Sequence, residues 1–190
     1  MHTIEPFYNW RKYYIASEDE RSPFYRQGVF SSMQPKQIYN FIIHPEWDDI
    51  GSSTLYVKVL YVSYRESFAV IELMGEWNDC IHNDIMYLKR NLIDGMVKNG
   101  IYRYILVGEN VLNFHCSDDC YYEEWLEDVM EEGGWIAAIN FRQHVLDEMK
   151  LGKLHHYINF GGGLNNLLWR KLPPLVLLRV VDEMIIKALR

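Results

Sequence analysis

Two long apolar runs at residues 54–77 constrain the fold of this chain more than any other feature. They read TLYVKVLYVSY and FAVIELMGEW, are rich in β-branched and aromatic residues, and are separated only by RES. Such runs are typical of β-strands, and so short a connection predicts an antiparallel hairpin. By the alternation of side chains along a strand, we expect one face of the first strand to carry Leu55, Val57, Val59 and Tyr61.

Helical and extended patterns alternate after this hairpin. The apolar residues between Ile81 and Met96 recur at helical spacing, with Asn78 or Asp79 as the N-cap and Gly100 as a stop signal. The expected helices lie around residues 81–99, 122–132, 142–154 and 173–189, and the expected strands at 38–44, 54–64, 68–77, 103–107, 135–141 and 155–160. This order predicts an α/β fold, in which a mixed β-sheet begins with an antiparallel hairpin and continues with βα repeats.

Residues 1–35 form an N-terminal arm that is rich in aromatic side chains and has no sustained period of a helix or strand. Its aromatic content is too high for a solvated tail, so we expect it to pack on the body or on a second subunit. Residues 36–190 are expected to form a single domain.

Composition narrows the classes of partner. The net charge is −7, and no basic run is longer than Arg11-Lys12, which argues against nucleic acid as a partner. The chain has neither a signal-peptide pattern nor an apolar stretch of about 18 residues, so we expect a cytoplasmic protein without a membrane span. Three cysteines are an odd number, which fits reduced thiols.

Two short motifs resemble a known family. Gly75-Glu76-Trp77-Asn78-Asp79 is similar to a Gly-Glu-Leu-Asp signature with one position added, and residues 113–119 (NFHCSDD) follow a second apolar strand. Together with the order of elements over residues 66–160, they resemble the STAS domain, the fold of SpoIIAA-type anti-sigma factor antagonists. The resemblance implies a STAS-like domain that binds a protein partner and is regulated through a phosphorylatable loop.

The resemblance places that loop at Cys116, Ser117, Asp118 and Asp119. Read without gaps, Cys116 falls at the family's Asp, Ser117 at its first Ser and Asp118 at the phosphorylated Ser. A shift by one residue puts Ser117 at the acceptor position instead, and both registers remain open. In either register an Asp replaces the glycine that follows the acceptor.

The chemistry-bearing residues do not complete a catalytic or metal-binding pattern. His115, Cys116 and Cys120 include metal ligands, but the other histidine pair, His155-His156, is expected to point to opposite faces of a strand. The acids of the loop oppose a reactive thiolate, and no nucleotide-binding or metalloprotease motif is present. We therefore expect no catalytic residue, no metal and no cofactor, and we interpret Asp48-Asp49 as an exposed turn.

Two functional hypotheses follow. The first is a non-enzymatic regulatory module that binds a protein, with a signalling protein as a candidate class, through the loop around Ser117 and Asp118. The second is a small-molecule binder or an enzyme with a cleft at the carboxyl ends of the strands, near Trp77, Glu76 and His115 and beside the arm at Trp47. A homodimer built by the aromatic arm is a third interpretation.

Overall fold

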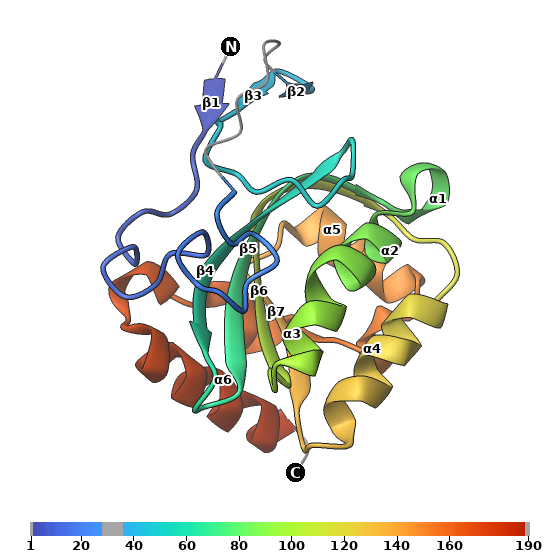
Figure 1. The fold of residues 1–190 in the computed structure, drawn as a ribbon. Coiled ribbons are helices and arrows are strands. Elements are labelled where there is room, and N and C mark those ends of the chain that lie inside the picture. Colours follow the sequence, from blue (N-terminus) through green and yellow to red (C-terminus); the bar gives the residue numbers. More distant parts are fainter. Residues whose placement is uncertain (1, 28–35, 189–190) are drawn as a thin grey trace.

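The computed structural model describes residues 2–27 and 36–188, and its centre is a five-stranded sheet (Figure 1). The strand order is β4-β5-β6-β7-β8. Only the β4–β5 pair is antiparallel, whereas each later pair is parallel. The predicted mixed α/β fold with an antiparallel hairpin is therefore confirmed. The strands are β4 (Leu55–Ser63), β5 (Phe68–Asn78), β6 (Arg103–His115), β7 (Trp135–Ile139) and β8 (Asn159–Phe160).

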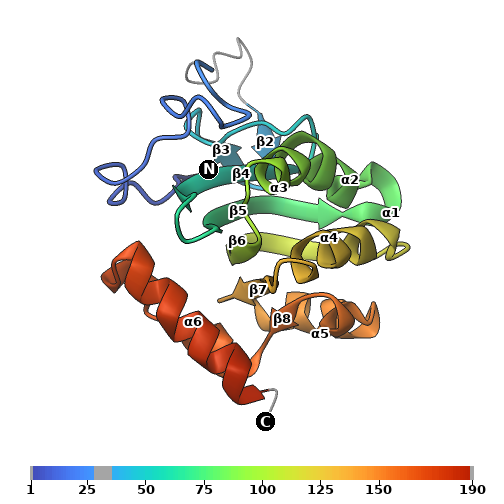
Figure 2. The same cartoon turned by 60° about the horizontal axis from the view of Figure 1, so that its bottom comes forward.

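Helices cover both faces of this sheet (Figure 2). On one face, a broken helix after β5 and the helices α4 (Cys120–Met130) and α5 (Gln143–Leu151) bury the larger core. On the other face, α6 (Pro174–Ala188) and Trp10 of the arm bury a second core. Because both faces are covered, the central strands are apolar on both sides, as their sequences indicated. No helix among the described residues is long and apolar enough to cross a membrane.

The helix after β5 differs from the continuous helix that the sequence predicted. It consists of α1 (Asp79–His82), α2 (Asp84–Leu88), a π-helical segment η1 (Lys89–Ile93) and α3 (Asp94–Lys98). Asn83 separates α1 from α2 because its backbone is left-handed, with φ 53°. The predicted N-cap is confirmed, since the Asn78 side chain accepts a hydrogen bond from the Ile81 N–H at 3.0 Å.

Three strand predictions were wrong in part. The strand expected at 103–107 continues as β6 to His115, so the first three residues of the segment 113–119 belong to this strand. The segment 38–44 is a tight pair of strands, β2 (Gln37–Ile38) and β3 (Phe41–Ile43), because Tyr39 takes a left-handed conformation with φ 51°. The segment 155–160 begins in a 3₁₀ turn, η2 (Leu154–His156), continues as a bend and pairs only at β8.

The hairpin also departs from simple alternation. Its pairing shifts between Val59 and Tyr61, which marks a β-bulge at Leu60. As a result Val59 and Val62 share the larger core, while Leu60 and Tyr61 contact the second core. The predicted shared face holds for the first three residues and fails at Tyr61.

The described part of the arm, residues 2–27, packs on the body, while residues 28–35 of the predicted arm lie outside the described residues. Its strand β1 (His2–Ile4) pairs in parallel with β3 in a small second sheet. Trp10 is buried beside Trp169, with ring centroids 5.5 Å apart. The arm thus contributes side chains to the core of the body.

Candidate functional site

The carboxyl ends of β5 and β6 bring the two predicted sites together. These strands are parallel, and their register pairs Asn78 with His115, so both strands end at the same edge of the sheet. There Glu76 Oε1 lies 3.3 Å from His115 Nε2. Glu76 also accepts hydrogen bonds from the Tyr39 hydroxyl at 2.8 Å and from Asn78 Nδ2 at 2.9 Å. Glu76 is therefore held by neighbours of this chain.

The Trp77 side chain is fully buried in the larger core and does not line the cavity beside β4. Its ring packs against Phe114 at 5.6 Å and Tyr122 at 6.2 Å between centroids, and its Nε1–H donates to Asp79 at 3.1 Å. The prediction of Trp77 as a cleft residue was wrong. Because β5 is covered on both faces, its side chains are buried whichever face of the sheet they point to.

Asp79, the last residue of the motif 75–79, is a buried and hydrogen-bonded carboxylate. Its carboxylate accepts hydrogen bonds from the Tyr122 hydroxyl at 2.5 Å and from the Ile85 N–H at 2.8 Å. Burial raises the pKa of this carboxyl to about 6, although these hydrogen bonds act in the opposite direction. Asp79 thus joins β5, α2 and α4, and its role in the described structure is to hold these elements together.

The loop 116–119 leaves the same edge and is exposed except at Cys116, which is half-buried. The Ser117 hydroxyl has no hydrogen-bond partner among the described residues. Asp118 accepts from the Cys120 thiol at 2.8 Å, and hydrogen bonds from Cys120 lower the pKa of Asp118. Asp119 is the N-cap residue of α4 but makes no capping bond and instead accepts from the Tyr157 hydroxyl at 2.5 Å.

The thiols near this loop are poor nucleophiles. Burial, followed by the charge of Asp79, raises the pKa of Cys116 to about 11. The hydrogen bond to Asp118 is the main cause that raises the pKa of Cys120. Both thiols are protonated at neutral pH, and a thiol reacts as its thiolate. The Cys80 thiol donates to the Cys116 carbonyl at 2.7 Å, which places α1 directly against the loop.

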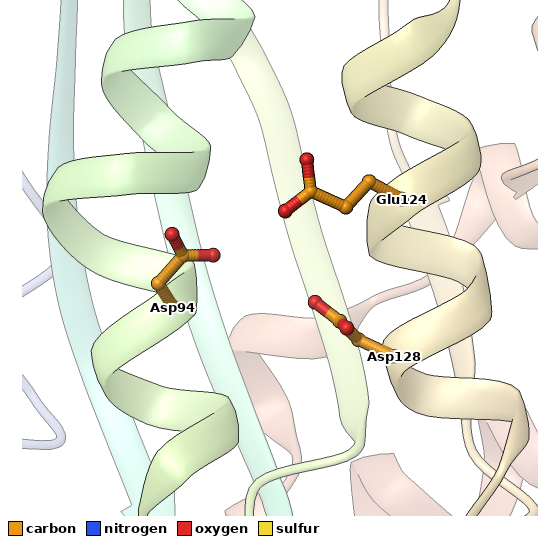
Figure 3. A group of neighbouring side chains, drawn as sticks. All are labelled: Asp94, Glu124 and Asp128. Carbon is orange, nitrogen blue, oxygen red and sulfur yellow. The ribbon is translucent and has the colours of Figure 1, made fainter.

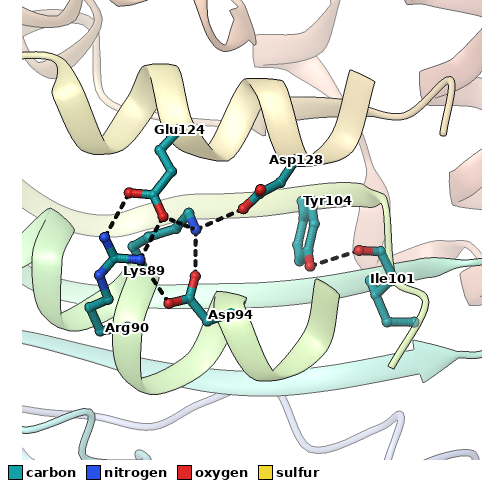
Figure 4. Close-up of polar contacts among 7 residues, drawn as sticks. All are labelled: Lys89, Arg90, Asp94, Ile101, Tyr104, Glu124 and Asp128. Atoms are coloured by element: carbon teal, nitrogen blue, oxygen red, sulfur yellow. Dashed lines mark hydrogen bonds and ion pairs between the residues drawn. The ribbon is translucent and has the colours of Figure 1, made fainter. Parts of the chain in front are cut away.

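A cluster of three carboxylates was not anticipated from the sequence. Asp94 on α3 and Glu124 and Asp128 on α4 point toward one another (Figure 3), and they form the one group of three metal-ligand side chains found among residues 2–27 and 36–188. The space between them is occupied by the ammonium of the buried Lys89 (Figure 4). The cluster is an internal ion-pair network. Two pairs spaced one helical turn apart, Glu124 with Asp128 and Arg90 with Asp94, were its signals in the sequence.

A cavity of about 600 Å³ lies between the arm and the edge strand β4. Trp47 lines it, whereas Trp77, Glu76 and His115 do not. Asp48 also lines it and is not the exposed turn residue that we predicted, since it pairs with Lys58 at 2.9 Å and bridges to Val57. Burial raises the pKa of Asp48 despite this ion pair.

Solved structures similar to this chain include two from one group of proteins. One is the anti-sigma factor antagonist SpoIIAA in its unphosphorylated form, with a TM-score of 0.42 and 12% identity, covering 56% of this chain and 89% of that chain. Another is a protein from Thermotoga maritima assigned as an anti-sigma factor antagonist, with a TM-score of 0.40 and 17% identity. The match covers 54% of this chain and 81% of that chain. Both likenesses extend over about half of this chain, as does the resemblance of residues 66–160 to the STAS domain.

No protein-family model matches the sequence, and no curated protein matches it.

Proposed function

We propose that this chain is a non-enzymatic regulatory module that binds a protein partner through the loop 116–119 and the helix ends on either side of it. One observation carries the proposal. Ile81 and Leu151, 77% and 76% exposed, are the two most exposed large apolar side chains among the described residues. Both adjoin residues that contact Cys116, since Cys80 bonds its carbonyl and a Cβ on Gly152 would lie 2.6 Å from its Sγ.

The exposed loop between these apolar residues supplies charge. Ser117, Asp118 and Asp119 are exposed, and they directly precede the first residue of α4. Apolar contacts surrounded by polar and charged groups are typical of a protein interaction site. The acidic loop also favours a partner whose docking surface is basic.

Regulation follows from the same position. A phosphate on Ser117 would add about −1.5 to −2 charges next to the N-terminus of α4. Because the Ser117 hydroxyl has no partner among the described residues, its modification breaks no hydrogen bond of the fold. The standing charge of Asp118 would provide a constant version of the same signal. Both registers of the loop therefore lead to one mechanism, in which charge at the start of α4 sets the affinity for the partner.

Partner capture from a lysate of the native host tests this function. The native chain, the double variant Ile81→Ser/Leu151→Ser and Asp118→Ala are immobilised in parallel, and the bound chains are identified by mass spectrometry. Leu168→Ser is the matched control, because Leu168 is 70% exposed but lies next to η4 (Trp169–Lys171), which packs in the second core. We expect the native protein and the Leu168→Ser control to recover the same partner proteins. The double variant and Asp118→Ala should no longer recover them. Equal recovery on all four would contradict the proposal.

A further inference from the structure

The cavity beside β4 has the dimensions of a ligand site and is independent of the loop 116–119. Its volume of about 600 Å³ falls within the range of small-molecule pockets, about 300–1,000 Å³. β4 is the edge strand of the large sheet, and the arm lies beside it together with the segment 45–49, whose Asp48 bridges to Val57 (Figure 1). The arm covers this edge without filling the space between them.

The apolar part of the wall is aromatic and rigid. Phe24 and Leu60 line the cavity and are 4% exposed, and Trp47 is 2% exposed. The Trp47 ring is fixed because its Nε1–H donates to the Ile4 carbonyl at 2.8 Å. Buried aromatic and aliphatic side chains that line a hollow favour a ligand with a flat apolar body.

The charged part of the wall consists of carboxylates held in ion pairs. Three carboxylates, Glu46, Asp48 and Asp49, line the cavity against two cations, Arg11 and Lys58. Each carboxylate has a cation partner, since Asp48 is bound to Lys58 at 2.9 Å, Asp49 to Lys36 at 2.8 Å and Glu46 to Arg11. Arg11 is the most exposed of these three cations, so Glu46 is the carboxylate that a ligand cation reaches most readily.

The chain itself shows how this wall holds a cation. The guanidinium carbon of Arg11 lies 4.4 Å from the centroid of the Tyr8 ring, and the same guanidinium pairs with the carboxylate of Glu46. An aromatic face together with a carboxylate is the combination that binds organic cations. Burial, and then the charges of Glu5 and Glu46, raise the pKa of Tyr8 to about 12, although the charge of Arg11 acts in the opposite direction. The Arg11 side chain is 44% exposed and can swing into solvent when a ligand takes its place.

We propose that the cavity between the arm and β4 binds a small aromatic cation, with its ring against Trp47 and Phe24 and its ammonium or guanidinium group between Tyr8 and Glu46. The ligand class is defined by the geometry of the wall: one flat apolar body and one positive charge. This function goes beyond partner binding and uses none of the residues of the loop 116–119.

Three probes of equal size and different charge test the ligand class on the full chain. Benzylamine is a cation, benzyl alcohol is neutral and benzoate is an anion, and each is titrated while ¹H–¹⁵N spectra are recorded. The indole N–H of Trp47 reports on the cavity, because this residue lines it. We expect saturable shifts with benzylamine, binding at least about fivefold weaker with benzyl alcohol, and no binding of benzoate.

Variants separate the cavity from the rest of the surface. Glu46→Gln removes the carboxylate and should weaken the binding of benzylamine by about fivefold. Ser17→Trp places a large ring in the cavity wall and should abolish binding. Glu18→Gln is the matched control, since it removes the same charge from an exposed neighbour that does not line the cavity. Thermal unfolding of each variant verifies that it is folded.

Some outcomes would overturn the proposal. Equal affinity for all three probes, or a preference for benzoate, would show that the cavity does not select cations. Benzylamine binding that survives Ser17→Trp would place the probe at another surface. Because the loop 116–119 is unchanged in each variant, partner capture stays intact whichever result is obtained, so failure here is distinguishable from failure of the proposed function.

Discussion

The ammonium nitrogen of Lys89 lies 2.8 Å from a carboxylate oxygen of Asp128, although 39 residues separate them in the chain. Lys89 is fully buried, and it also bonds Glu124 at 3.2 Å and pairs with Asp94. The network connects the π-helical segment after β5 with α4, the helix that begins at the proposed docking loop. A buried cation in such a position is stable only because carboxylates surround it.

Replacing Lys89 by Met should therefore destabilise the protein. The variant leaves three carboxylates close together without their central cation, which costs about 2 kcal/mol of unfolding free energy once their partial exposure is considered. Lys98→Met is the control, because Lys98 is exposed on α3, and its effect should stay within about 0.5 kcal/mol. Urea unfolding at pH 7 measures both. An unchanged midpoint for Lys89→Met would show that the network contributes no net stability.

Acid titration of the same variant gives a second prediction. Although burial acts in the opposite direction, hydrogen bonds from Lys89 and Arg90 lower the pKa of Asp94. A carboxyl whose pKa is lowered in the folded state adds stability above its unfolded pKa, and this stability is lost as the pH falls through the folded value. Removing the Lys89 cation diminishes this shift. Between about pH 5 and pH 3 Lys89→Met should thus lose less stability than the native chain, and an equal or steeper loss would contradict this assignment.

The Glu72 carboxyl should make the folded protein less stable as the pH rises, the opposite of the effect of Asp94. Burial raises the pKa of its carboxyl from 4.5 to about 7, even though the Phe7 N–H donates to it at 2.8 Å. The folded state then binds a proton more tightly than the unfolded state, so stability is full below about pH 4.5 and decreases as the pH rises toward 7. The shift corresponds to about 3 kcal/mol.

Glu72→Gln should remove this contribution and leave a smaller decrease, because burial also raises the pKa of Asp79 to about 6. Unfolding free energies at pH 5 and pH 8 measure the difference. Glu131→Gln, an exposed site on α4's C-terminal end, should reproduce the native pH dependence. Identical pH dependence in Glu72→Gln and the native chain would show that Glu72 ionises normally.

The elements that the sequence predicted well are those fixed by local patterns. The hairpin, α4, α5 and α6 follow from apolar spacing and from turn or capping residues close in sequence. The bulge at Leu60 could not be predicted, because no Gly or Asn marks it. In the turn between β2 and β3 the left-handed residue is Tyr39 and not the neighbouring Asn40, which is the residue type that more often takes this conformation. Tertiary packing imposes both conformations.

The candidate site was predicted unevenly for a similar reason. The meeting of Glu76 and His115 follows from the parallel order of their strands, and the structure shows it. The burial of Trp77 and of Lys89 depends on which helices cover each face, which local spacing does not reveal. The cavity at Trp47 requires the path of the arm, and the arm has no periodic pattern from which its path could be derived.

Gly75 of the Gly-Glu motif should tolerate no side chain. Its backbone has φ +111°, and an added Cβ would lie 2.2 Å from the Thr54 carbonyl oxygen. Gly75→Ala should destabilise the protein by about 3 kcal/mol or more. The positive φ is strained for alanine, and the added Cβ would clash with a backbone atom, which cannot move aside as a flexible side chain can. Gly95→Ala is the matched control, since Gly95 is helical and its nearest neighbour would lie 3.5 Å away. It should be neutral or stabilising by up to about 1 kcal/mol in urea unfolding. Equal effects of the two changes would mean that the motif glycine has no conformational role.

Trp10 decides whether the arm belongs to the cooperative unit of the fold. It is 3% exposed and packs on Trp169, so Trp10→Ala should cost about 3 kcal/mol of unfolding free energy. The variant should also speed tryptic cleavage after the exposed residues Arg11 and Lys12, because the arm loses its anchor. Tyr13→Ala, at a residue that is 50% exposed, should leave both measurements close to native values. If Trp10→Ala changed cleavage but not the free energy, the arm would open independently of the body, and the wall of the cavity would be mobile rather than rigid.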